Sequence, residues 1–171
     1  MLQFENIILR PLKDEDANAL AELANNKKIF DNVRDALPHP YTLDDAFFFI
    51  NLTKQESLQV SFAIEYEGAF CGMIGLIPQK DVYRLTAEIG YWLGEPFWGK
   101  GIITKAVTLV TGYGFNQLGF IRIHTGIFEY NIASMRVLEK NGYRKECVFE
   151  KSVIKNGRIW NEYRYAKLKN E

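Results

Sequence analysis

The most informative part of the chain is the stretch Glu88–Thr104, which reads EIGYWLGEPFWGKGIIT. A largely apolar strand runs into a glycine turn, and the turn opens a helix whose apolar residues recur at helical spacing. Amide groups at a helix start, with roughly half a positive charge from the dipole, hold anions such as phosphate. Gly99 and Gly101 lack a Cβ, so a phosphate can approach their backbone. The alternative is a helix that simply begins with a flexible turn.

Other phosphate motifs compete for the same glycines. Gly94, Gly99 and Lys100 match the spacing of a Walker A loop, but Gly101 stands where that loop has its magnesium-binding hydroxyl. Gly99 and Gly101 also begin a dinucleotide fingerprint, but Thr104 replaces its third glycine. A degenerate phosphate loop that prefers ATP or a nicotinamide dinucleotide therefore stays open as an alternative.

Composition narrows the class of protein. The chain has 171 residues, with 21 Lys and Arg against 21 Asp and Glu, so its formal net charge is zero. This balance argues against a dedicated binder of nucleic acid or of a membrane surface. The N-terminal residues have no basic and apolar signal segment, and no apolar run reaches the ~18–20 residues that span a bilayer. We therefore expect a cytoplasmic protein.

The cysteines and histidines do not favour a metal site. The chain has two cysteines, Cys71 and Cys147, and two histidines, His39 and His124, with no CxxC spacing. We expect no metal, and we expect the cysteines to be reduced and partly buried. Neither is predicted to be a nucleophile.

The periodicity predicts one domain, 1–171, of mixed α/β class with mostly antiparallel strands. Strands are expected over 7–9, 61–66, 70–77, 87–93 and 121–127, followed by a hairpin around Asn156-Gly157. Helices are expected after the acids at 14–16, after the capping residue Thr42, over 102–115 and over 131–140.

Two motifs in order carry a family resemblance. WGKGIITKA after EIGYWL, followed by NIASMRVLEKNGY at 131–143, closely resembles the GNAT superfamily of acetyl-CoA-dependent N-acetyltransferases. The resemblance extends over nearly the whole chain and is strongest to the branch with the ribosomal-protein N-terminal-alanine acetyltransferases. It implies a central, mostly antiparallel twisted sheet of about seven strands, splayed in the middle, with about four helices on both faces. It also implies acetyl-CoA as co-substrate.

The resemblance also suggests how the cofactor is bound. The family's pyrophosphate motif, Arg/Gln-x-x-Gly-x-Gly/Ala, falls on Trp98, Gly101 and Ile103, of which only the middle glycine matches fully. Binding is therefore expected mainly through backbone N–H groups, with Lys100 as a charge partner. The cofactor-binding residues implied are Tyr91, Trp92, Leu93, Trp98, Gly99, Lys100, Gly101, Ile102, Ile103, Thr104, Asn131 and Ser134.

The resemblance places two catalytic candidates, Ser134 and Glu88. Ser134 falls where related enzymes hold a hydroxyl near the thioester sulfur, and Leu138 stands where many members have a tyrosine. Ser134 is thus the expected acid, unless its hydroxyl only bonds its own backbone. Asn131 is a helix N-cap, a contact to the cofactor arm, or both. Glu88 is the expected base, directly or through water, unless it is a structural or exposed acid.

The acceptor is expected to be a primary amine. Deprotonating a lysine at neutral pH takes roughly 4 kcal/mol, whereas a protein α-amino group takes well under about 1 kcal/mol. A site with one modest base therefore favours the N-terminal α-amine of a protein or peptide. An amino acid, polyamine or antibiotic amine stays open, as does a non-catalytic acetyl-CoA-binding module. The protein is expected to be a monomer or homodimer.

Overall fold

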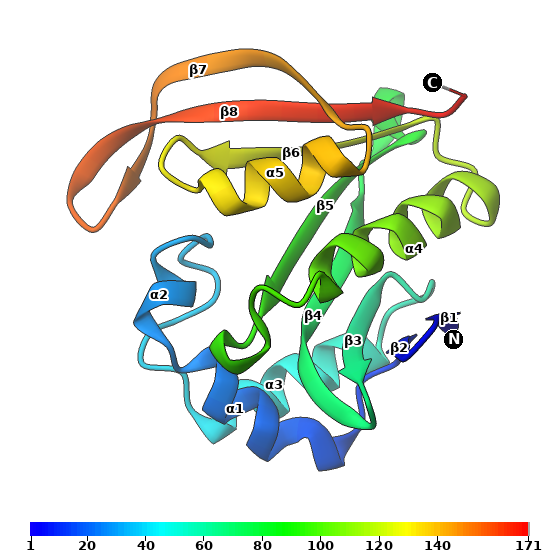
Figure 1. The fold of residues 1–171 in the computed structure, drawn as a ribbon, viewed down its shortest axis with the longest axis vertical. Coiled ribbons are helices and arrows are strands. Elements are labelled where there is room, and N and C mark those ends of the chain that lie inside the picture. Colours follow the sequence, from blue (N-terminus) through cyan, green and yellow to red (C-terminus); the bar gives the residue numbers. More distant parts are fainter. Residues whose placement is uncertain (171) are drawn as a thin grey trace. The chain divides into compact units, whose positions relative to one another are not determined.

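The computed structural model describes residues 1–170. Figure 1 labels its helices and strands. The eight strands are β1 (Leu2–Phe4), β2 (Ile7–Arg10), β3 (Ser61–Tyr66), β4 (Ala69–Pro78), β5 (Thr86–Leu93), β6 (Arg122–Phe128), β7 (Arg144–Lys155) and β8 (Arg158–Leu168). The five α-helices are α1 (Ala17–Ala24), α2 (Lys27–Phe30), α3 (Leu43–Lys54), α4 (Ile102–Asn116) and α5 (Ile132–Lys140). Short 3-10 turns are η1 (Asp14–Asp16), η2 (Asp81–Tyr83) and η3 (Glu95–Phe97).

The strands form one open sheet in the order β1-β2-β3-β4-β5-β6-β8-β7. Neighbours from β1 to β4 and from β6 through β8 to β7 are antiparallel, whereas β5 and β6 are parallel. The predicted mixed α/β fold with mostly antiparallel strands is confirmed. The sheet has eight strands rather than about seven because residues 2–4 pair with β2. A single turn at residues 27–30 adds the fifth helix.

The chain divides into two compact units. Unit 1 comprises Met1–Gly75 and Tyr91–Leu109, and unit 2 comprises Leu76–Gly90 and the chain from Val110 onward. The strands β4 and β5 and the helix α4 contribute residues to both units. A single functional domain over residues 1–171 stays a prediction.

Unit 1 is built around the antiparallel strands β1–β4 and two helices, α1 and α3, that lie side by side (Figure 1). As predicted, Thr42 caps α3: its hydroxyl accepts a hydrogen bond from the Asp45 amide at 3.2 Å. The Asp45 carboxylate in turn accepts one from the Thr42 amide at 2.8 Å, which completes a capping box. The apolar faces of these helices bury Leu20 and Ile50 in the core of the unit.

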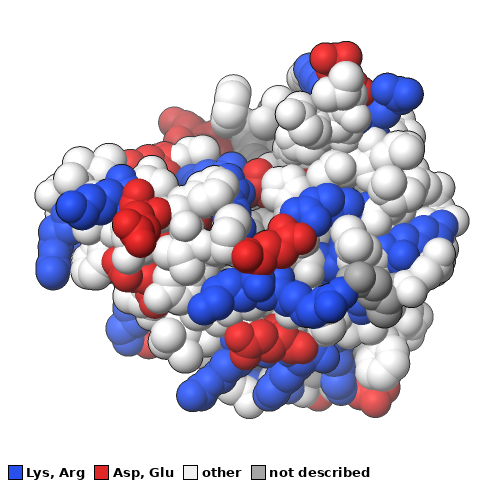
Figure 2. All heavy atoms as spheres, turned by 90° about the horizontal axis from the view of Figure 1, so that it is seen from above, with Lys and Arg blue, Asp and Glu red and all other residues white. Residues whose placement is uncertain are grey.

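Unit 2 is built around β6, β8 and β7. The helix α5 runs along β6 and β8 (Figure 1), and the Tyr165 hydroxyl on β8 donates to Glu139 on α5 at 2.9 Å. Asn156 and Gly157 turn the last hairpin with φ of 51° and 72°, as the type I′ signal predicts. The face seen in Figure 2 carries Lys and Arg interspersed with Asp and Glu.

The two cysteines differ in environment. Both are free thiols; Cys71 is buried and Cys147 is exposed. The expectation of partial burial was therefore wrong for Cys147, because β7 is the last strand of the sheet and its residues 144–150 are exposed. Burial raises the pKa of the Cys71 thiol to about 12, which keeps it protonated near neutral pH.

Candidate active site

The glycine turn of unit 1 is anchored at both its start and its middle. The Gly94 amide donates to the Cys71 carbonyl at 2.8 Å, which fastens the turn to β4. The chain then makes the turn η3, and the Trp98 indole N–H reaches back to the Leu93 carbonyl at 2.7 Å. Trp98 therefore fixes the shape of the turn through its side chain.

Beyond Trp98 the backbone is open to a ligand. Gly99 and Gly101 have φ of 76° and 74°, and a Cβ built on either meets no atom within 4 Å. Ile102 follows as the first residue of α4 and is buried, so the helix start is held in place. The amide groups in the first turn of a helix have no partner within the helix itself. Open glycines at a fixed helix start fit a phosphate group.

A close backbone approach positions residues 91–93. A Cβ on Gly72 of β4 would lie 2.9 Å from the Leu93 Cα and closer still to the Trp92 carbonyl. Only glycine lets β4 and the end of β5 come this near. The Trp92 ring packs edge-on to Phe70 at 6.3 Å between centroids. The end of β5 is therefore held both by its backbone and by a buried aromatic contact.

The one charged side chain within the glycine pair is Lys100. Its Nζ lies 5.5 Å from the centre of the Phe97 ring and 6.0 Å from that of Tyr66. Both distances are within the range of a cation–π interaction. These rings hold the ammonium group beside the turn, where a phosphate at the helix start would meet it.

In unit 2, α5 begins as the sequence predicted. The Asn131 side chain accepts a hydrogen bond from the Ser134 amide at 3.1 Å, so Asn131 is the N-cap. Ser134 is buried in the first turn of the helix, and Leu138 is fully buried one turn later. The cap uses the Asn131 side-chain oxygen and the Ser134 backbone amide, so the Asn131 Nδ2 group and the Ser134 hydroxyl take no part in it.

Glu88 lies in the part of β5 that belongs to unit 2. Its side chain is half-buried, and it pairs in register with His124 on the parallel strand β6. The pairing of these strands joins Thr86–Glu88 to Arg122–His124, and Glu88 with His124 is its last pair. Glu88 is thus a partly sheltered carboxylate with an imidazole as its neighbour.

The predicted residues fall into two groups. Residues 91–93 and 98–104 lie together in unit 1, whereas Glu88, Asn131 and Ser134 belong to unit 2. Their assignment to one site stays a prediction. Sequence reasoning missed the Trp98 anchor, the close approach at Gly72 and the neighbour His124. A glycine in the middle of an apolar strand was the signal for Gly72. No local pattern indicates the Trp98 anchor or the pairing with His124.

The described part of the chain offers neither a cluster of metal ligands nor a membrane-spanning helix. Within residues 1–170, no three side chains of His, Cys, Asp and Glu gather as a metal ion would need. None of the helices in that range is both long and apolar enough to cross a membrane.

Several known proteins are similar in sequence to this chain along most of its length. A Bacillus subtilis protein provisionally named an N-acetyltransferase, YjcK, is 32% identical over 99% of this chain and 97% of its own. Another, YdaF, provisionally named a ribosomal N-acetyltransferase, is 30% identical over 98% of this chain and 93% of its own. The spermidine N(1)-acetyltransferase of Escherichia coli K12 is 25% identical over 93% of this chain and 84% of its own.

Solved structures share the fold. A GNAT-family acetyltransferase from Bacillus anthracis superposes with a TM-score of 0.87 and 26% identity over the whole of both chains. The microcin C7 self-immunity acetyltransferase MccE, solved with acetyl-CoA and AMP, has a TM-score of 0.81 and 26% identity over 97% of this chain and 94% of its own. The family model described as "Acetyltransferase (GNAT) domain" matches residues 6–144. The chain belongs to the GNAT family of N-acetyltransferases.

Proposed function

We propose that this enzyme transfers the acetyl group of acetyl-CoA to the N-terminal α-amine of a protein or peptide. The observation that carries the choice of acceptor is the similarity to YdaF along nearly the whole chain. The chemistry agrees with it, because an α-amine is largely deprotonated near neutral pH and needs only a modest base. Glu88, half-buried on β5, is a base of that kind.

The chain's own residues divide the work. Acetyl-CoA supplies an activated acyl group. The backbone amides of residues 99–104 and the Lys100 ammonium bind its pyrophosphate, while the backbone of residues 91–93 and the side chain of Asn131 orient its arm. Glu88, directly or through water, accepts the amine proton. The Ser134 hydroxyl donates a proton to the leaving sulfur. The transfer is direct, with no acyl-enzyme, and residues 1–171 act as one domain.

The open glycine turn supports acetyl-CoA as the co-substrate. Two left-handed glycines with no atom near their built Cβ positions stand at the start of a 15-residue helix. A pyrophosphate needs that approach to backbone amides. The Trp98 side chain is not required for it, because its indole N–H already bonds to Leu93.

The test compares acceptors at a fixed concentration of acetyl-CoA, with CoA release followed through its thiol. One peptide has a free N-terminal alanine and no lysine, its matched control is N-formylated with one internal lysine, and the third acceptor is spermidine. The proposal predicts a kcat/KM for the free α-amine at least about tenfold above the other two, since the lysine and polyamine amines are protonated. Faster turnover of spermidine would overturn the choice of acceptor. Binding of acetyl-CoA without transfer to any of them would overturn the enzyme assignment.

A further inference from the structure

A row of register partners crosses the sheet of unit 2 at Glu88. Glu88 on β5 pairs with His124 on β6, His124 with Ala166 on β8, and Ala166 with Arg144 on β7. Register partners on neighbouring strands project from the same face of a sheet. Glu88 and His124 are therefore adjacent side chains on one face, and the next position in the row is a small alanine.

Several charged groups face His124. The Glu88 and Glu146 carboxylates favour its charged form, whereas the Arg122 and Arg164 guanidinium groups oppose it. Arg122 is bonded to Glu146 at 2.7 Å, so the effects of this cation and this anion on His124 partly cancel. Burial is the largest influence and lowers the pKa of His124 below its ordinary value of 6.5. The ring is therefore neutral near neutral pH and has a nitrogen free to accept a proton.

Arg164 is held in the same way, because its Nε lies 3.0 Å from a Glu162 oxygen. Both cations that act on His124 are thus engaged by carboxylates, Arg122 by Glu146 on β7 and Arg164 by Glu162 on its own strand β8. This arrangement lets the ring gain a charge with less repulsion than two free guanidinium groups would cause.

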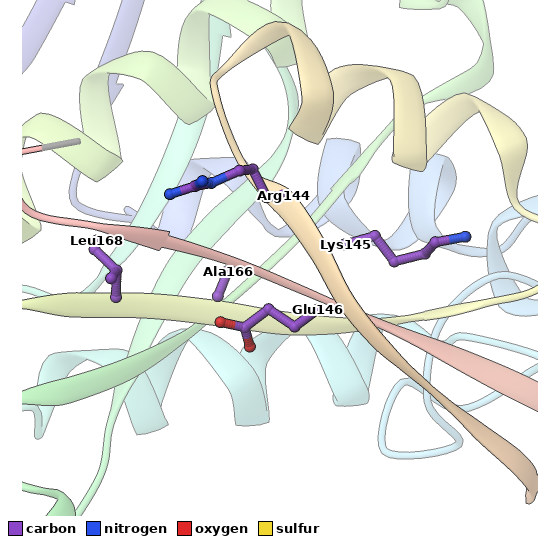
Figure 3. Close-up of a pocket in the computed structure, with 5 residues that line it drawn as sticks. All are labelled: Arg144, Lys145, Glu146, Ala166 and Leu168. Carbon is purple, nitrogen blue, oxygen red and sulfur yellow. The ribbon is translucent and has the colours of Figure 1, made fainter.

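The β8 and β7 end of this row, Ala166 and Arg144, borders a solvent-filled hollow. An open hollow of about 320 Å³ lies over β7 and β8 and is lined by Arg144, Lys145, Glu146, Ala166 and Leu168 (Figure 3). Ala166, the register partner of His124, forms part of its wall. Figure 3 shows the Glu146 carboxylate beside this alanine while Lys145 extends away. The hollow therefore borders the strand position that pairs with His124.

We propose that His124 receives the proton that Glu88 takes from the acceptor amine and passes it to water in this hollow. The inference rests on the proposed function, in which Glu88 is the base. The proton moves from the amine nitrogen to a Glu88 carboxylate oxygen, then to a ring nitrogen of His124, then to solvent, and Glu88 is returned to its ionised form. No other bond changes in the relay. His124 acts through Glu88 and does not touch the acceptor.

The test is the pH dependence of kcat for the wild type relative to His124→Gln, with saturating acetyl-CoA and α-amine peptide. The ratio is expected to be about tenfold or more near neutral pH and to fall towards one as the pH drops through the titration midpoint of His124, below which the imidazole is already protonated. The ionisation of the acceptor affects both profiles equally, so it does not affect the ratio of the two kcat values. His39→Gln is the matched control, because the chain has only two histidines, and its ratio to wild type should not vary with pH.

A second measurement needs no change at His124. In His39→Gln the remaining imidazole signals in an NMR titration belong to His124. The titration midpoint of these signals should lie below pH 6.5 and should coincide with the pH at which kcat falls on the acid side. A wild type that acetylates no amine would overturn the proposed function. An active wild type whose ratio to His124→Gln is flat in pH, or whose acid limb departs from the titration, would overturn the relay alone.

Discussion

Arg10 is a buried cation held by two carboxylates. Its guanidinium bonds to both oxygens of Asp16, at 2.7 and 2.8 Å, and its Nε bonds to Glu65 at 2.6 Å. Burial raises the pKa of Asp16, but the hydrogen bonds from Arg10 and from the Lys13 amide lower it by more. The net shift of the pKa is therefore downward. The pair ties the start of the first helical segment to β2 and β3.

Loss of this pair should destabilise unit 1. Asp16→Asn leaves a buried guanidinium with one partner fewer and should lower the free energy of unfolding by about 3–5 kcal/mol. A carboxyl whose folded pKa is depressed contributes stability above its unfolded pKa, and that contribution is lost as pH falls through the folded value. Urea unfolding at neutral pH and below about pH 4 measures both effects. Asp14→Asn is the matched control, since its exposed bond to Lys54 is worth at most about 1 kcal/mol.

Ser134 offers a clean separation of structure from catalysis. The N-cap bond to Asn131 comes from the backbone amide of residue 134, so Ser134→Ala keeps it. The variant should lower kcat by about a hundredfold, the usual size of a general-acid contribution, while the Kd for CoA changes little. Steady-state kinetics and CoA titration decide this. Equal turnover in both proteins would refute the acid role.

At the scale of elements, the proposed cofactor binding depends on the glycine turn before α4. Gly101 and Gly157 share a left-handed backbone, with φ of 74° and 72°, and both have open space around the Cβ position. They differ in location, because Gly101 precedes α4 whereas Gly157 lies in the turn between β7 and β8. The pair therefore separates backbone strain from ligand contact.

Alanine at either glycine should cost about 1–2 kcal/mol of stability through the left-handed conformation. Only Gly101→Ala should also weaken CoA binding, by about tenfold or more, because its methyl group occupies the approach to the backbone amides. Thermal unfolding and CoA titration of the two variants provide the comparison. Equal CoA affinity in both would remove the turn from the binding site.

Elements with a capping residue or a turn motif in their own sequence were predicted correctly. The cap at Thr42, the Asn-Gly hairpin and the long helix after the glycine turn were all found from their own residues, because caps and turns depend on neighbours along the chain. The short segments Leu2–Phe4 and Lys27–Phe30 were missed, since three or four residues are too few to show a period. The pairing of Glu88 with His124 was out of reach, because the register of two parallel strands is set by packing between distant segments.

At the scale of the whole molecule, charge does not select the ligand. The 21 cations equal the 21 anions, and the face in Figure 2 mixes the two signs. In the proposed site, an anionic cofactor is recognised by local groups, namely the backbone of residues 99–104 and Lys100. Such a site should discriminate between ligands that all carry phosphates.

Thermal unfolding with different ligands examines this. At a concentration of a hundred times Kd, a ligand stabilises the folded state by about 2.7 kcal/mol, which raises Tm by roughly 5–10 °C for a chain of this length. Acetyl-CoA and CoA should each give such a shift, and ATP and NAD should not. A larger shift with ATP or NAD would favour a nucleotide-binding loop instead.

The central claim is that this chain acetylates an α-amine. The most direct measurement is mass spectrometry of a peptide that has both a free N-terminal alanine and an internal lysine, after incubation with the enzyme and acetyl-CoA. The account predicts a single added acetyl group located on the N-terminal nitrogen, and a reduced yield with Glu88→Gln. An acetyl group on the lysine side chain, or an unmodified peptide beside a protein that binds acetyl-CoA, would contradict it.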